Sequence, residues 1–457
     1  MLKKSIFILL GLTTMVAAIQ AQQDSTKVEA NAYFKEGKLH FRSKDKKFHL
    51  WFDNRVYIDA AAYSTGADID QMTTKPNKDI PVINDDAVDD GKFRFSNGIV
   101  LRRARIGFKA EYLKWFGELD VDVAYNLVEV EDMYLGYKFN DNFNIKVGNF
   151  KEPMSIERVT SSKALTAIER PMVVQALCEG RRLGVAGTGF GKIANTVGWW
   201  ASAGFFGQTA TAMLKERNRG NDGYGAAARL AITPVMNEQT TVHIGASGSY
   251  RTPESWWGNA VPTVEFRTTP ESYVDHRRFV RTRIANVEDY MTTGLELAFR
   301  YDKFLAYGEY MFTDLSRSNS SGVALKNAEF DGWYVTASYM ILGKAREYDP
   351  SEAEFKNAAT RAKTGNLEVL GRVSTLNLND FHDKKAVITG GSAYCYTAGI
   401  NWYPTRNVLI GLNYTYTDND KYADDNGSLQ YKGQPLSKSY TQGLDFNTWQ
   451  MRFLFSF

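Results

Sequence analysis

The last eleven residues of the chain, 447–457, restrict its fold more than any other stretch, because polar and apolar side chains alternate along them. Successive side chains of a β-strand point to opposite faces. One face therefore carries Trp449, Met451, Phe453, Phe455 and Phe457, and the other carries Thr448, Gln450, Arg452, Leu454 and Ser456. A final strand with an aromatic face and a mostly polar face is typical of the closing strand of an outer-membrane β-barrel, between lipid and a watery lumen. A soluble β-sandwich that buries the aromatic face is the alternative.

This assignment of the two faces of the last strand predicts that they tolerate substitutions differently. A charged residue at Phe453 should impair insertion or stability, because that side chain would face lipid. A neutral residue at Arg452 should be tolerated, because that side chain would face the lumen. Equal sensitivity at both positions would contradict the register.

The composition favours one large sheet. Aromatic residues make up 13% of the 457 residues, and glycine occurs 37 times against 11 prolines, which suits pleated strands joined by tight turns. The mean hydropathy of −0.37 argues against a bundle of membrane helices. The formal charge is +3, of which Lys3 and Lys4 contribute two, so the rest of the chain carries +1. Such a balance gives no electrostatic preference for nucleic acid.

The N-terminal segment has the parts of a secretory signal peptide. Lys3 and Lys4 precede the apolar run 5–19, and the small residue Ala21 follows it. We therefore expect residues 1–21 to be a signal peptide that is removed on export toward the bacterial outer membrane. Residues 22–47 then predict a short periplasmic hairpin, and residues 48–457 predict the transmembrane β-barrel.

From residue 48 onward the chain repeats a strand followed by a turn or a loop. The segments are long enough to cross a membrane, which takes about nine to eleven residues. We expect about sixteen antiparallel strands, at 48–63, 99–112, 115–125, 130–139, 143–151, 183–190, 196–206, 224–232, 240–250, 291–301, 304–312, 330–342, 367–375, 393–403, 408–417 and 447–457. Short connections alternate with long ones, as in barrels with short periplasmic turns and long external loops. The connection 343–366 is an exception, because it is long and charged and falls among the periplasmic turns.

Basic side chains gather on the inward face of the second predicted strand. Arg103, Arg105 and Lys109 share this face, and Arg55 lies on the inward face of the first strand. Sixteen strands enclose an aqueous channel, and rings of arginine and lysine select anions in pores. The alternative is that these groups only pair with acidic residues of the same face, namely Asp53, Asp59, Glu111, Glu118, Asp120 and Asp122. Arg102 falls on the apolar face, where its stem would reach toward lipid headgroups.

The connection 151–182 differs from the other loops because apolar residues run through it. Met154, Ile156, Leu165, Ile168 and Val173 would not stay in solvent, so we expect the segment to fold into the barrel mouth as a constriction. An external cap is the alternative. Its basic residues, opposed by four glutamates, are Lys151, Arg158, Lys163, Arg170, Arg181 and Arg182.

Four short motifs carry a resemblance to a known family. They are LRRARIGF at 101–108, VGNFKEP at 147–153, ERP at 169–171 and RRLG at 181–184. Together they resemble the phosphate-selective porin O and P family of outer-membrane proteins. The resemblance implies a sixteen-strand barrel, usually a homotrimer, with an inward-folded constriction loop and basic residues that guide oxyanions. It makes small inorganic anions the expected cargo, with phosphate and polyphosphate as candidates.

A second basic cluster precedes the predicted strand 291–301. Arg277, Arg278, Arg281 and Arg283 fall within seven residues, so we expect them at the outer mouth. Basic groups there would raise the local concentration of anions before they reach the constriction. Two alternatives stay open: binding to phosphates of outer-membrane lipopolysaccharide, and pairing with Glu271, Asp275, Glu288 and Asp289.

Signals for an enzyme are poor. The glycine run 187–191 precedes no helix start, and the five histidines include no H-x-x-x-H pair. Cys178 and Cys395 have no metal-ligand spacing, so we expect both to be structural and expect no metal or cofactor. The sequence predicts a channel. The alternatives are a surface adhesion or structural protein, with Trp256, Trp257, Tyr273 and Phe279 in an external loop, and a barrel hydrolase with a serine and a histidine on the wall.

Overall fold

The computed structural model describes residues 30–65, 95–126, 128–194, 196–210, 220–221, 223–256, 261–318, 324–358, 364–384, 387–423 and 443–457. The expected signal peptide, 1–21, lies outside these ranges, and so does Trp257. Among the described residues, no helix is long and apolar enough to span a membrane.

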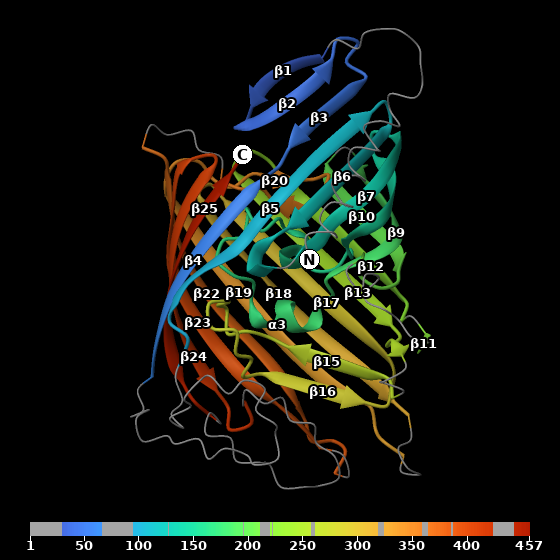
Figure 1. The fold of residues 1–457 in the computed structure, drawn as a ribbon, viewed down its shortest axis with the longest axis vertical. Coiled ribbons are helices and arrows are strands. Elements are labelled where there is room, and N and C mark those ends of the chain that lie inside the picture. The colour runs from blue at the N-terminus through green and yellow to red at the C-terminus, as the bar shows by residue number, and fades with distance from the viewer. Residues whose placement is uncertain are drawn as a thin grey trace.

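Within the described ranges, sixteen antiparallel strands close into a barrel (Figure 1). The last strand pairs with the first along its whole length, with Phe453 opposite Ile58 and Trp449 opposite Ala62. The strands are β4 (Arg55–Thr65), β5 (Gly98–Tyr112), β6 (Trp115–Asp122), β7 (Glu129–Asn140), β8 (Phe143–Lys151), β9 (Arg181–Ile193), β10 (Val197–Phe206), β12 (Gly225–Met236), β13 (Thr240–Arg251), β17 (Val287–Tyr301), β18 (Phe304–Arg317), β19 (Ala328–Leu342), β22 (Asn366–Asp380), β23 (Ile388–Thr405), β24 (Val408–Asn419) and β25 (Phe446–Ser456). The predicted fold class and number of strands are confirmed.

The alternation along β25 is as predicted. Trp449 is 54% exposed and Phe453 is 40% exposed on the outer face, whereas Arg452 is 3% exposed on the inner face. Arg452 is, however, paired with two carboxylates, at 2.7 Å from Asp59 and close to Glu169. This pairing argues against the expected tolerance of a neutral residue at Arg452, because removal would leave buried carboxylates without their partner.

Three strands extend the sheet beyond the barrel at the end where the C-terminus lies (Figure 1). They are β1 (Ala30–Lys35), β2 (Lys38–Ser43) and β3 (Phe48–Phe52). β2 pairs with β3, which in turn pairs with β5 just ahead of the point where β4 takes over as the partner of β5.

Short and long connections lie at opposite ends of the barrel. The turns after β5, β17 and β23 consist of two residues each, and they lie at the same end as the C-terminus, which we call the short-turn end (Figure 1). The connection between β19 and β22 also leaves from this end, so the charged exception in the sequence pattern does not change the strand count. It carries β20 (Tyr348–Asp349) and β21 (Glu354–Phe355) and enters the lumen, where the Nε1 of Trp200 donates to the carbonyl of Ser351 at 2.9 Å.

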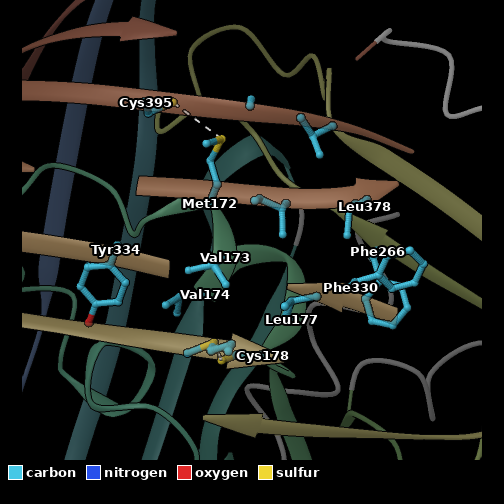
Figure 2. Packing of buried hydrophobic residues seen from close by; sticks show 14 of the residues in the cluster. Met172, Val173, Val174, Leu177, Cys178, Phe266, Phe330, Tyr334, Leu378 and Cys395 are labelled. Atoms are coloured by element: carbon cyan, nitrogen blue, oxygen red, sulfur yellow. Dashed lines mark hydrogen bonds between the residues drawn. The ribbon is translucent and has the colours of Figure 1, made fainter. Parts of the chain in front are cut away.

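Two segments fold into the lumen from the long-loop end and bury an apolar cluster there (Figure 2). The first contains α2 (Ile156–Val159) and α3 (Met172–Leu177), whose Val173 and Val174 are fully buried. The second contains β15 (Thr263–Arg267) and β16 (Arg281–Ala285), and it brings Phe266 and Phe279 into the same cluster. The predicted inward fold of the first segment is thus observed, whereas the second segment was not expected inside.

Both cysteines belong to this apolar cluster. The Sγ of Cys178 lies 3.6 Å from the Sδ of Met311, and the Sγ of Cys395 lies 3.7 Å from the Sδ of Met172 (Figure 2). Both thiols are buried and free. They fill space between the segment and the wall.

Three minor elements complete the described chain. They are η2 (Ala124–Asn126) between β6 and β7, and the two-residue strands β11 (Gly220–Asn221) and β14 (Ser255–Trp256), which pair with each other.

Candidate functional site

The inward segments are fixed to one side of the barrel by buried ion pairs. Arg372 on β22 holds Glu157 at 3.1 Å, and Arg346 in the β19–β22 connection holds Glu368 at 2.7 Å. On β12, Arg229 binds Glu296 at 2.9 Å and the carbonyl of Ala353 at 2.8 Å. These charges are compensated and excluded from solvent, so this side of the lumen is a packed core.

An open cavity remains along the opposite wall, which β5 to β10 form. Its volume is about 850 Å³, and its lining includes ten basic and eight acidic side chains. Eight of the ten basic residues were predicted from the sequence, namely Arg55, Arg103, Arg105, Lys109, Lys151, Arg158, Arg170 and Arg181. The other two, Lys138 and Lys146, were not predicted. Lys163 and Arg182 do not line it. The excess of positive charge is small, so the placement of the charges decides what the cavity favours.

A β-bulge turns Arg102 into the lumen and corrects the expectation that it faces lipid. Tyr57 pairs with Arg103 but Ile58 pairs with Leu101, so Arg102 is the extra residue. A bulge shifts the alternation by one residue, and Arg102 therefore points inward, with its Nε 2.8 Å from Oε1 of Glu169. Its guanidinium also lies 4.0 Å from the ring centre of Tyr273. A second cavity of about 150 Å³ lies here, and Arg103 and Glu131 line both cavities.

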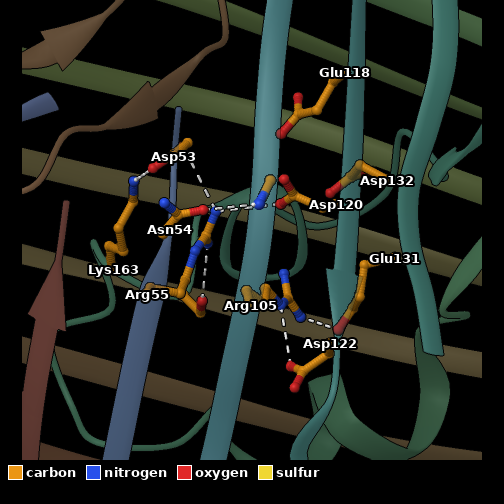
Figure 3. Close-up of polar contacts among 12 residues, drawn as sticks. Asp53, Asn54, Arg55, Arg105, Glu118, Asp120, Asp122, Glu131, Asp132 and Lys163 are labelled. Carbon is orange, nitrogen blue, oxygen red and sulfur yellow. Dashed lines mark hydrogen bonds and ion pairs between the residues drawn. The ribbon is translucent and has the colours of Figure 1, made fainter. Parts of the chain in front are cut away.

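The basic row of β4 and β5 is paired with carboxylates while it lines the main cavity (Figure 3). Arg55 lies 3.3 Å from Asp120 and 3.6 Å from Asp53. The Nε of Arg105 lies 3.2 Å from Asp122. The row also pairs Arg105 and Arg103 with Glu131, and Lys109 with Glu118 at 2.9 Å. The row therefore has features of both hypotheses, because its side chains line the cavity and are also paired with carboxylates.

Three cations of the constriction segment differ, because main-chain carbonyls hold them. The Nζ of Lys151 donates to the carbonyls of Val159 and Thr160 at 2.7 and 3.0 Å. The Nε of Arg158 donates to the carbonyl of Glu179 at 2.7 Å, and Arg170 donates to the carbonyl of Thr160 at 2.7 Å. Among the described residues, no carboxylate forms an ion pair with any of the three. We call Lys151, Arg158 and Arg170 the unpaired cation cluster.

Arg170 is buried beside a second cation of this cluster, Arg158. Burial, followed by the positive charge of Arg158, lowers the pKa of Arg170 to about 10. Uncompensated positive charge in a confined, partly desolvated space is what an oxyanion stabilises most effectively.

The remaining basic residues of the constriction segment are neutralised. Lys163 is paired with Asp53, which also receives Lys38 of β2 at 3.2 Å (Figure 3). Arg181 is paired with Asp132 at 2.6 Å and with Glu131. Arg182 is paired with Glu179.

The four arginines predicted for the outer mouth lie in the second inward segment, away from the main cavity. Arg281 and Arg283 are on β16, where Arg281 pairs with Glu265 and Arg283 is exposed opposite it. Arg277 lies 3.9 Å from Asp275, and Arg278 is half-exposed. The contact with Asp275 agrees with the alternative that these arginines pair with nearby carboxylates. A role in capturing anions stays a prediction.

Three lumen carboxylates, Glu118, Asp120 and Asp132, bring oxygens within 4.8 Å of one another. Each already has a cationic partner, because Lys109, Arg55 and Arg181 bind them respectively. A metal ion would have to displace three basic groups, so the arrangement fits ion pairing better than metal coordination.

The position of His243 does not suit the catalytic histidine of a barrel hydrolase. The residue is fully buried, with Nδ1 2.8 Å from the hydroxyl of Tyr348 and Nε2 3.2 Å from Glu296. Its ring is part of the packed side of the lumen and does not face the open cavity.

Comparison with known proteins places this barrel in a family. Residues 83–457 match the family described as phosphate-selective porin O and P. The chain belongs to this family. Porin O of Pseudomonas aeruginosa is 22% identical over 338 residues, which cover 69% of this chain and 75% of that protein. An uncharacterized protein of Caulobacter vibrioides is 24% identical over 333 residues, which cover 70% of this chain and 63% of that protein.

Solved structures share the fold at low identity. An anion-selective porin from Comamonas acidovorans has a TM-score of 0.50 and 10% identity, and the match covers 90% of this chain and all of that one. OmpT of Vibrio cholerae has a TM-score of 0.48 and 12% identity over 90% of this chain and 99% of that one. By its family and its closed sheet, the chain is an outer-membrane porin barrel with a lumen narrowed by its own inward segments.

Proposed function

We propose that this porin is a channel for the passive diffusion of small anions across the outer membrane. The observation that carries the proposal is the unpaired cation cluster, Lys151, Arg158 and Arg170, on the wall of the open cavity. Main-chain carbonyls orient the three groups, and no carboxylate of the described residues is paired with them. A passing anion can therefore exchange its hydration for contacts with preformed donors, while a cation meets a repulsive field.

Phosphate is the candidate oxyanion that the family suggests. A guanidinium offers paired N–H donors that match two phosphate oxygens, and Arg158 and Arg170 both carry such groups beside Lys151. Polyphosphate would engage several of these groups at once. The association of three barrels into a homotrimer is also a proposal, and it rests on the family alone.

The proposal is tested by reversal potentials of the purified full chain in planar bilayers with asymmetric KCl. We expect the wild type to favour chloride and the variant K151Q/R158Q to lose most of that preference. Glutamine can still donate to the carbonyls that Lys151 and Arg158 hold, so the segment should keep its position.

The matched control is K114Q/K192Q, which removes the same charge from two exposed lysines that do not line the cavity. At about 1 M KCl the screening length is about 3 Å, so these exposed charges outside the cavity lining should have much less effect. A cation-selective wild type would overturn the anion proposal. Block of the chloride current by phosphate in the wild type, lost in K151Q/R158Q, would support phosphate as a cargo.

An adhesive role for the outer loop is less well supported by its placement. Tyr273 lies under the guanidinium of Arg102, and Phe279 is buried in the apolar cluster. Side chains that are turned into the lumen are not available to an outside partner.

A further inference from the structure

Aromatic side chains cover part of the open cavity, although inward positions of a water-filled barrel are normally polar. We call this surface the aromatic wall, and it consists of Phe116, Tyr134, Phe150, Phe190 and Trp200. Tyr134 contacts both Phe116 and Phe150 edge to face, with ring centres 6.1 and 6.0 Å apart respectively. A pore that passed only hydrated inorganic ions would gain nothing from such a surface.

The wall depends on a glycine on the neighbouring strand. A Cβ at Gly136 would lie 2.3 Å from the Cζ of Phe116, so the ring of Phe116 occupies the space that a side chain would need. The ring therefore lies across β7 beside Tyr134, whose hydroxyl donates to Glu118 at 2.9 Å. Both rings are part-exposed on the cavity side.

Three cations of the described residues lie over rings of this wall. Lys138 lies 5.5 Å from the ring centre of Phe116 and is paired with Glu111, and Arg229 lies 5.0 Å from that of Trp200 and is paired with Glu296. The third cation is Lys146. The Nζ of Lys146 lies 5.3 Å from the ring centres of both Tyr134 and Phe150. Among the described residues, no carboxylate forms an ion pair with Lys146, in contrast to Lys109 and Lys138 nearby. Asn144 lies two residues away on the same face of β8, and it also lines the cavity.

From this arrangement we infer that the porin has a second anion subsite for organic anions, on the short-turn side of the unpaired cation cluster. The ligand is a carboxylate or a phosphate ester joined to a flat ring. The head group binds Lys146, and the ring lies on Phe116 and Tyr134. This inference rests on the proposed anion function and makes it more specific.

The dimensions agree with such a ligand. The cavity of about 850 Å³ is within the range of about 300 to 1,000 Å³ that small-molecule sites occupy. Contacts between aromatic rings contribute binding free energy beyond that of the apolar area that a ring buries. A ring should therefore strengthen binding about tenfold over the bare head group.

The test compares two pairs of probes that share a head group and differ by a ring. Benzoate is compared with acetate, and phenyl phosphate with inorganic phosphate, as blockers of the chloride current through the full chain in planar bilayers. We expect each ring-bearing probe to block at about a tenfold lower concentration than its partner. The two head groups distinguish carboxylates from phosphate esters as the natural class.

Three variants connect the effect to the wall. K146Q should abolish block by all ring-bearing probes, and F116L/Y134L should reduce the ring advantage to near one. F143L is the matched control, because Phe143 is an exposed aromatic residue on β8 that does not line the cavity. The shift in gel mobility on heating, which a folded barrel shows, confirms that each variant is folded.

The outcomes separate this inference from the proposed function. Equal block by benzoate and acetate, and by phenyl phosphate and phosphate, in a chloride-selective wild type overturns the inference and leaves the anion channel standing. A ring advantage that survives F116L/Y134L also overturns it. A cation-selective wild type overturns the proposed function itself. Because the probe comparison is made on the wild type, the test is decisive even where a variant does not fold.

Discussion

Replacement of Arg452 by glutamine should destabilise the barrel, although this residue faces the lumen. Its Nε and Nη2 lie 2.7 Å from the two oxygens of Asp59, and Nη2 also contacts Glu169. The side chains of Arg452 and Asp59 are 4% and 0% exposed. The pair thus joins the closing strand, the first strand and the constriction segment.

The loss in free energy of unfolding depends on which partners Asp59 and Glu169 keep after Arg452 is replaced. Removal of one partner of a buried ion pair costs about 3 to 5 kcal/mol. Glu169 keeps Arg102, at 2.8 and 3.2 Å, and Asp59 keeps the amide of Gln450 at 3.0 Å. The loss should therefore be at the lower end, about 3 kcal/mol. Lysine at the lipid-facing Phe453 should cost about 2 to 4 kcal/mol near the bilayer centre, so both faces are sensitive for different reasons.

The assay is urea unfolding of the chain in phospholipid vesicles, followed by tryptophan fluorescence, for D59N, R452Q and D59N/R452Q. Removal of both charges should restore much of the stability, because neither group is left alone in a buried site. A loss below about 1 kcal/mol for R452Q, or a double variant that shows the sum of the single losses, would refute the buried-pair reasoning.

Two further predictions concern the route of the anion. Burial, followed by the positive charge of Arg55, lowers the pKa of Lys163 to about 7, so its charge is lost as the pH rises from 6 to 8.5. Lys163 does not line the cavity, but its loss of charge leaves Asp53, which does, with one cationic partner fewer. The chloride preference measured by reversal potential should therefore fall over this interval, whereas K163R, which stays charged, should show no such change. Replacement of Arg277, Arg278, Arg281 and Arg283 by glutamine should slow phosphate or sulfate flux at low salt and have less effect at high salt, since charges are screened over about 8 Å at physiological ionic strength; unchanged flux at low salt would leave these arginines a structural or lipid-binding role.

Alternation predicted most of the wall from the sequence, because a period of two depends only on local geometry. It failed at Arg102, where one extra residue in β5 turned two consecutive arginines inward. The sequence of one strand does not reliably show a bulge, because a bulge depends on the pairing with the neighbouring strand. The adjacent pair Arg102 and Arg103, however, was itself a hint, because a lipid-facing arginine is costly.

The contents of the lumen were harder to predict than its wall. The apolar residues of 151–182 indicated an inward fold. Phe266 and Phe279, in contrast, lie between many polar residues, and their burial depends on partners distant in sequence: Phe266 packs on Phe330 of β19, and Phe279 packs on Phe446 of β25. Lys146 was missed for another reason. A single lysine on a strand carries no functional signal in the sequence. Only the positions of Tyr134 and Phe150 around its ammonium group, seen in the structure, indicate a binding role.

The same residue types build two different environments within one barrel, and the difference is the number of carboxylates near each cation. On the side of β12, β17 and β22, Arg229 and Arg372 meet carboxylates from strands and inward segments, and the fully compensated pairs hold a solid core. Along β8, Lys146 and Lys151 line the open cavity and form no ion pair with a carboxylate of the described residues. A buried pair stabilises position, and an unpaired cation attracts a mobile anion. The packed side can therefore be understood as the support that keeps the few unpaired cations of the opposite wall in place.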